Sequence, residues 1–124
     1  SFLSAMSGPL TIYYGDEIMM DGSHDPDCRR GMIFDQEYNK DIKNIIKNLI
    51  KLKHLPAFKI GELKIQKIGK SSLMINRYYN DEEINLIVAF DEDLSLAELK
   101  GKTNLFDNTV FEGNLTNQKI LIYK

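Results

Sequence analysis

The sequence predicts a mixed α+β chain in which an amphipathic helix precedes an antiparallel sheet. The helix is predicted by aliphatic residues that recur every three or four positions and so share one face: Ile42, Ile45, Ile46, Leu49 and Ile50. After Ala57 the pattern changes to short runs rich in Ile, Leu, Val and Tyr, separated by turn residues, as in strands. The isolated apolar run Leu10–Tyr14 predicts a further strand, buried on both faces. Because no repeated strand-helix unit accompanies this run, we interpret it as the edge of a larger structure.

The predicted helix runs from Asn39 to His54. Asn39 or Asp41 is suited to cap its first turn, because these side chains accept hydrogen bonds from free backbone N–H groups. Pro56 ends the helix by His54 or Leu55, since proline lacks an N–H donor and restricts the residue before it. The lysines opposite the apolar stripe are interpreted as a solvated face, because no aromatic residues alternate with them to stack on bases.

Four segments after the helix are predicted to be strands of one antiparallel sheet: Glu62–Ile68, Ser72–Tyr79, Glu83–Phe90 and Gln118–Tyr123. Turn residues at Gly69, Asn80-Asp81 and Asp91–Asp93 follow the first three. Residues 94–117 are less regular, and two short strands are predicted there, at Leu105-Phe106 and Val110-Phe111.

Length and composition predict one modest domain, or one domain with a piece of another. Apolar residues make up 43% and charged residues 27%, which argues against disordered and fibrous classes. The 16 basic and 18 acidic residues give a formal charge of −2, so a protein built to bind nucleic acid by neutralising phosphates is excluded. No apolar run is long enough to span a membrane. Cys28 has no second cysteine for an internal disulfide, which favours a reducing, cytoplasmic setting.

Several groups of polar residues are given structural interpretations, and no cofactor is expected. Asp16 and Glu17 are neighbours, and neighbours on a strand point to opposite sides, so they are poorly placed for paired acid-base chemistry. The acidic run Asp91–Asp93 lacks the spacing of a calcium loop and is interpreted as a solvated turn. His24 and Cys28 are too few for a closed zinc site.

Two motifs in the first third of the chain resemble a known enzyme family. Residues Ser7–Ile18 read Ser-Gly-Pro-Leu-Thr-Ile-Tyr-Tyr-Gly-Asp-Glu-Ile and are similar to the segment around the last barrel strand of the α-amylase family of glycoside hydrolases. Residues Asp25–Asp35 read Asp-Pro-Asp-Cys-Arg-Arg-Gly-Met-Ile-Phe-Asp and are similar to a loop of the neopullulanase, cyclomaltodextrinase and maltogenic amylase branch. The resemblance extends through the basic helix and the β-rich tail. Met19-Met20 departs from the branch, which has a glycine and a hydrophobic residue there.

The resemblance implies an architecture in two parts. Residues 1–56 are implied to be the end of a catalytic (β/α)8 TIM barrel, with its last strand, a substrate loop and the closing helix. Residues 57–124 are implied to be the antiparallel β-sandwich called domain C. Loops at the C-terminal ends of barrel strands build the active site. Asp25 and Arg29 match substrate-binding positions that contact a glucose unit on the non-reducing side of the cleaved bond, where a carboxylate accepts from and a guanidinium donates to hydroxyls.

The implied activity of the parent enzyme is retaining hydrolysis of α-1,4 links, and of some α-1,6 links, in maltooligosaccharides, cyclodextrins or pullulan. Retaining enzymes need one carboxylate as nucleophile and another as general acid. In the family these two, and a third supporting acid, lie on earlier barrel strands, so no residue here is assigned as catalytic and the chain alone is predicted to be inactive. Ser23-His24-Asp25 is superficially similar to an Asn-His-Asp motif of the family, but that motif precedes the Tyr-Tyr-Gly-Asp-Glu strand, so Asp25 is not called catalytic.

Two other interpretations stay open. In one, the chain is a non-enzymatic carbohydrate-binding module in which Tyr78 or Tyr79 packs on sugar rings. In the other, its tail serves only to stabilise a barrel or a homodimer. Because an orphan strand and helix expose apolar surface, residues 1–35 are expected to be mobile or to be hidden by self-association.

Overall fold

A computed structural model describes residues 2–34, 40–117 and 119–124 of the chain. Its helices are α1 (Phe2–Ala5), α2 (Lys40–Lys53) and α3 (Pro56–Lys59), with single 3-10 turns at Asp16–Ile18, Asp27–Arg29 and Ala97–Leu99. Its strands are β1 (Glu62–Lys67), β2 (Ser72–Tyr79), β3 (Glu82–Ala89), β4 (Leu94–Ser95), β5 (Asn114–Leu115) and β6 (Ile120–Tyr123). The predicted α+β class is confirmed. Within the described part of the chain, no helix is both long and apolar enough to cross a membrane.

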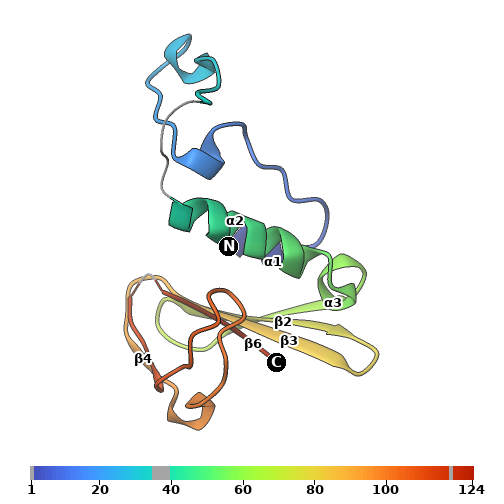
Figure 1. Cartoon of the computed structure of the whole chain (residues 1–124). Coiled ribbons are helices and arrows are strands. Elements are labelled where there is room, and N and C mark those ends of the chain that lie inside the picture. Colours follow the sequence, from blue (N-terminus) through green and yellow to red (C-terminus); the bar gives the residue numbers. More distant parts are fainter. Residues whose placement is uncertain (1, 35–39, 118) are drawn as a thin grey trace.

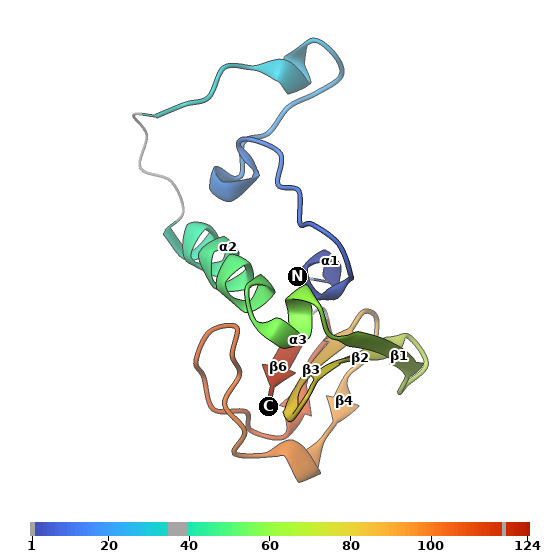
Figure 2. The ribbon, with the colours of Figure 1, turned by 90° about the vertical axis from the view of Figure 1, so that its right-hand side faces the viewer.

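The main sheet has four antiparallel strands in the order β1-β2-β3-β6. The helices cover one face of this sheet (Figure 1). Most of segment 94–117, with its short β4–β5 ladder, lies against the other face, whereas its Leu105 and Phe106 pack on the helix side. Figure 2 shows β1 at the free edge of the sheet. The β-rich tail is therefore a regular sheet with a thinner and mostly irregular second layer.

Helix α2 forms where the aliphatic stripe predicts it. Leu49 and Leu52 are buried against the sheet, and Ile45 packs beside them. The helix ends as proline requires, because Leu55 takes an extended conformation and Pro56 begins α3. The predicted capping residue Asn39 lies outside the described residues.

Each face of the sheet has its own apolar core, because successive strand residues point to opposite sides. Ile84, Leu86 and Val88 of β3 join the core under the helices. Ile87 and Ala89 of the same strand join the second core, which includes Phe111, Leu115 and Leu121. Strand β3 is buried on both faces, which explains its continuous apolar sequence.

The predicted boundaries of the main strands are nearly correct. Ser72–Tyr79 is confirmed as written, and the other strands begin or end one or two residues from the predicted limits. The two weaker strands are wrong in place. Leu105-Phe106 lies in a turn and Val110 forms an isolated bridge with Thr103, whereas the short ladder pairs Leu94-Ser95 with Asn114-Leu115. Single apolar pairs carry too little periodicity to distinguish these arrangements.

The predicted strand over Leu10–Tyr14 is not formed in this structure. Residues 9–13 have no regular secondary structure, and the exposed fractions of Tyr13 and Tyr14 are 55% and 42%. A strand is stabilised by hydrogen bonds to a neighbouring strand, and none of the described strands pairs with this segment. The segment instead runs beside α2, where Leu10 and Ile12 face Ile50 and His54 across a cavity of about 320 Å³.

Candidate functional site

The candidate site is the loop of residues 21–31, which lies at the far end of the molecule from the sheet (Figure 1). It carries both predicted substrate-binding residues, Asp25 and Arg29. The loop folds into a compact turn because Asp27 N–H donates to the His24 carbonyl at 2.9 Å and Arg29 N–H donates to the Pro26 carbonyl at 3.0 Å. The Asp25-Pro26 peptide bond is cis.

A fork between Asp27 and Arg30 holds the loop together. Arg30 donates from Nε and Nη2 to the two carboxylate oxygens of Asp27, both at 2.6 Å. Ser23 N–H also donates to Asp27 Oδ2, at 2.9 Å. The hydrogen bond from Arg30, followed by that from Ser23, lowers the pKa of the Asp27 carboxyl below its usual value. Such bidentate pairs fix the orientation of both side chains.

The two sides of the loop approach each other closely at Gly22. A Cβ atom there would lie 2.9 Å from the Cα of Cys28, so only glycine allows this close approach. On the other side, the hydroxyl of Tyr14 donates to the Arg30 carbonyl at 2.8 Å. The loop and the Tyr13-Tyr14 pair enclose a cavity of about 180 Å³.

The structure brings Asp25 and Arg29 together. Arg29 Nη2 donates to Asp25 Oδ2 at 2.6 Å, and the side chains are 69% and 57% exposed for Arg29 and Asp25. The pair presents a carboxylate and a guanidinium side by side to solvent. One hydrogen bond uses one of the five guanidinium donors, so the pair retains donors and acceptors for a hydroxylated ligand.

The other sequence-predicted groups have the following positions. Asp16 and Glu17 lie in a 3-10 turn, where Glu17 accepts a hydrogen bond from Gly15 N–H at 2.9 Å. Among the described residues, no three His, Cys, Asp or Glu side chains gather closely enough to hold a metal ion. The supporting roles of Tyr14, Asp27 and Arg30 were not predicted. The spacing of Asp27 and Arg30, three residues apart in a turn, was the available signal.

Comparisons with known proteins identify related enzymes. No protein-family model matches the sequence. The chain is 34% identical over 111 residues to a cyclomaltodextrinase of Thermoanaerobacter pseudethanolicus, covering 76% of this chain and 19% of the relative. It is 52% identical over 48 residues to neopullulanase 2 of Thermoactinomyces vulgaris, covering 38% of this chain and 8% of the relative.

A solved structure supports the same assignment. The crystal structure of a maltogenic amylase from S. marinus aligns with a TM-score of 0.77 and 32% identity, covering 90% of this chain and 16% of that one. The chain thus spans less than a fifth of the length of each of these three proteins. The chain belongs to the α-amylase family of glycoside hydrolases, in its neopullulanase, cyclomaltodextrinase and maltogenic amylase branch, and corresponds to one portion of such an enzyme.

Proposed function

We propose that this chain is the C-terminal portion of a retaining α-glucan hydrolase. Its parent enzyme cleaves α-1,4 links, and some α-1,6 links, in maltooligosaccharides, cyclodextrins or pullulan. In this proposal residues 1–56 complete a catalytic barrel and residues 57–124 form domain C. The names of the relatives, cyclomaltodextrinase, neopullulanase and maltogenic amylase, support this substrate class.

The observation that carries the proposal is the exposed Asp25–Arg29 pair on a braced loop. Two adjacent hydroxyls of a glucose unit can donate to the carboxylate and accept from the guanidinium at the same time. The bidentate Asp27–Arg30 pair holds the loop in place, so little ordering of the loop backbone is needed when a sugar binds. Asp25 and Arg29 therefore bind and orient the substrate and do not take part in bond cleavage.

The chain alone is proposed to be inactive. Retaining hydrolysis requires a nucleophilic carboxylate and a general acid about 5–5.5 Å apart. Neither role is assigned to a residue of this chain, since the corresponding positions of the family lie on other barrel strands. Incubation of the purified chain with maltotriose is expected to release no glucose, and measurable release would contradict this part of the proposal.

The substrate role of the pair is tested in the complete product of the coding sequence that contains this chain. Replacement of Asp25 by Asn or of Arg29 by Met is expected to raise the KM for maltotriose about tenfold and to change kcat less, because hydrogen bonds to a charged group are lost in binding. Asp21→Asn is a suitable control, since Asp21 is an exposed carboxylate of the same loop. Its contact with Arg30 is long, at 3.8 Å, compared with the 2.6 Å hydrogen bonds between Arg30 and Asp27. Equal effects of all three changes would contradict a specific role for the pair.

A further inference from the structure

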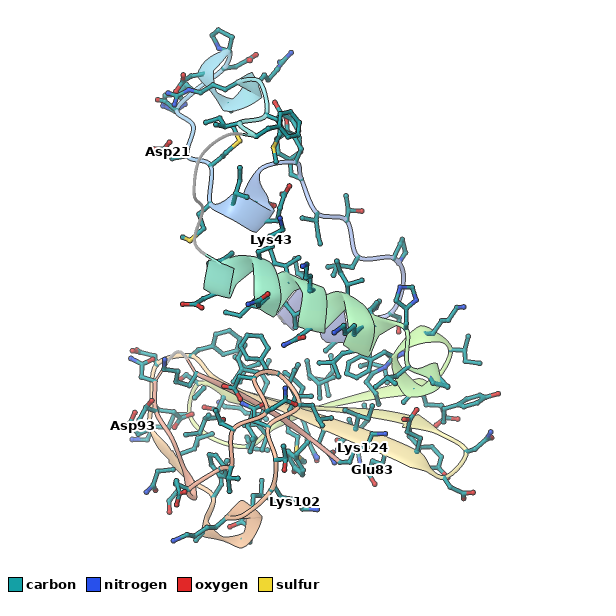
Figure 3. All side chains as sticks on the ribbon, viewed as in Figure 1. Asp21, Lys43, Glu83, Asp93, Lys102 and Lys124 are labelled. Carbon is teal, nitrogen blue, oxygen red and sulfur yellow. The ribbon has the colours of Figure 1, made fainter. Side chains whose placement is uncertain are left out.

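A second candidate site lies on the sheet, remote from the loop. The two ends of segment 94–117 cover the face of the sheet opposite the helices over β3 and β6, where Ile87, Phe111 and Leu121 pack. Over β1, β2 and the start of β3 the same face is open and holds a groove of about 510 Å³. In Figure 3, Glu83, which lines this groove, lies below the sheet, and Asp21 of the loop lies at the opposite end of the molecule.

The register of the strands explains which side chains meet in the groove. Lys64 of β1 pairs with Asn76 of β2, and Asn76 pairs with Asn85 of β3. Residues that face each other across strands point to the same side, so this row carries polar groups across the sheet. Tyr78 pairs with Glu83 in the next row, and Gln66 pairs with Met74 in the row on the other side.

Side-chain amides form the floor of the groove. Gln66 Nε2 donates to Asn76 Oδ1 at 3.1 Å, and Asn76 Nδ2 donates to Asn85 Oδ1. These bonds use one N–H of Gln66 and one of Asn76, and each amide carries two. Gln66 and Asn76 are only half-buried. Their hydrogen bonds fix the orientation of the side-chain amides, which are still open to a ligand. Beside it, the ring of Tyr78 is 49% exposed.

The composition of the groove indicates the class of ligand. Glu62 and Glu83 outnumber Lys64 among the charged groups that line it, which disfavours phosphates and other anions. Leu63 and Met74 are the aliphatic residues in its lining, and Leu63 packs against the core on the helix side. This leaves too little apolar surface for a lipid or an apolar peptide. Fixed amides beside an exposed aromatic ring instead suit a neutral, hydroxyl-rich ligand, whose hydroxyls bond the amides and whose apolar ring face packs on tyrosine.

We propose that this groove is a second carbohydrate-binding site, separate from the Asp25–Arg29 loop, in which Tyr78 supports a sugar ring and Asn76 and Gln66 bond its hydroxyls. The identification of the ligand as an α-glucan chain rests on the proposed function of the parent enzyme. The groove itself rests on the sheet geometry alone. A site here holds a glucan on the enzyme at a distance from the place of cleavage.

The two neighbouring tyrosines provide a matched pair of variants. Tyr78 lines the groove, whereas Tyr79 points to the opposite face, because successive strand residues alternate. Both are partly exposed, at 49% and 36%. The expected result is that Tyr78→Ala weakens binding of maltoheptaose to the chain about tenfold, that Tyr79→Ala changes it less than twofold, and that Tyr78→Phe retains it.

Binding is followed by heteronuclear NMR, in which the side-chain NH2 signals of Gln66 and Asn76 are expected to move on addition of maltoheptaose. An Asp25→Asn, Arg29→Met double variant separates the two sites, since it is expected to leave these shifts unchanged. Loss of the shifts in that variant, or equal effects of the two tyrosine changes, would contradict the proposal that the groove binds carbohydrate. Shifts with cellohexaose and none with maltoheptaose would support a carbohydrate site in the groove and contradict the α-glucan as its ligand.

Discussion

At the scale of single residues, the buried guanidinium of Arg77 connects distant parts of the chain. Arg77 is 1% exposed, and it donates from Nε to the Ala57 carbonyl at 3.0 Å and from Nη2 to the carbonyls of Phe58 and Gly61 at 2.9 and 3.0 Å. Its Nη1 donates to Ser7 Oγ at 3.0 Å. Burial lowers the pKa of Arg77 from its usual value. One guanidinium therefore joins β2 to the last turn of α3 and to the N-terminal segment.

Loss of this guanidinium is expected to destabilise the fold strongly. Replacement of Arg77 by Met keeps much of the aliphatic length and leaves three carbonyls without their donor, so the free energy of unfolding is expected to fall by about 3 kcal/mol or more. Urea denaturation followed by circular dichroism measures this change. Lys64→Met removes an exposed cation from the adjacent strand and is expected to change stability by less than about 0.5 kcal/mol.

Arg77→Lys distinguishes the hydrogen bonds from the charge. Lysine keeps the positive charge but has a single ammonium group, which cannot reach the acceptors that the planar guanidinium reaches together. Its stability is expected to lie nearer to that of the Met variant than to that of the original chain. Full stability of the Lys variant would show that charge, and not geometry, is the source of the effect.

At the scale of elements, Glu92 joins the β1–β2 turn to the end of β3. Its carboxylate accepts hydrogen bonds from Lys70 N–H at 3.1 Å, Ser71 N–H at 2.8 Å and Ser72 Oγ–H at 2.6 Å. Gly69 makes this approach possible, because a Cβ atom there would lie 2.2 Å from Glu92 Oε1. The acidic run 91–93 is thus more than a solvated turn, since its middle residue connects two loops.

The connection is expected to make stability depend on pH. The hydrogen bond from Ser72, followed by that from Ser71, lowers the pKa of Glu92 below its usual value of 4.5. A carboxyl with a lowered pKa stabilises the fold fully above the pKa of the unfolded chain, and this contribution is lost as the pH falls through the folded pKa. Glu92→Gln is therefore expected to lower the melting temperature at pH 7, with the difference from the original chain shrinking below pH 4.5.

Thermal melts of both proteins at several pH values measure that difference. Asp91→Asn is the matched control, because it removes an exposed carboxylate next to Glu92 and is expected to leave the melting temperature nearly unchanged. A constant difference between the Gln variant and the original chain from pH 7 to pH 3 would contradict a contribution from the ionised carboxylate.

At the scale of the whole molecule, the N-terminal part of the chain and the sheet differ in how far their apolar side chains are buried. The sheet has cores on both faces, whereas the N-terminal part displays large apolar side chains, with Leu3, Met19 and Phe34 exposed by 70%, 64% and 85%. This surface is consistent with the proposed barrel, which would cover it. The separate chain is expected to hide it by self-association.

Light scattering coupled to size exclusion tests this expectation. The apparent mass is expected to rise with protein concentration, and Phe34→Ser is expected to reduce the rise. Val110→Ser is the control, because Val110 is 57% exposed on the segment that covers the other face of the sheet. A monomer at every concentration would contradict the expectation.

Local patterns predicted most of the regular structure. The three-and-four spacing of Ile42–Ile50, the stop at Pro56 and the strand Ser72–Tyr79 each depend on residues close in sequence, and the structure confirms them. The substrate-binding role of the candidate site stays a prediction. Asp25 and Arg29 were found through the resemblance, and the structure adds that they lie 2.6 Å apart on a loop braced by Asp27 and Arg30.

Long-range contacts decided what the sequence left open. The run Leu10–Tyr14 has a strand composition, but no strand pairs with it in this structure, so it stays irregular. Arg77 gave no sign of its role, because its acceptors come from residues 16 to 70 positions away. Tyr78 and Tyr79 are equivalent in sequence, and only the faces of the sheet tell them apart.

The sequence by itself therefore determined the helix, the main strands, the turns and the family motif, since these depend on propensity and spacing within short segments. Only the tertiary structure decided which carbonyls Arg77 satisfies, which turns Glu92 joins and where the polar rows of β1, β2 and β3 stay open. The physical reason is that burial and hydrogen-bond partners are properties of surfaces brought together from distant parts of the chain.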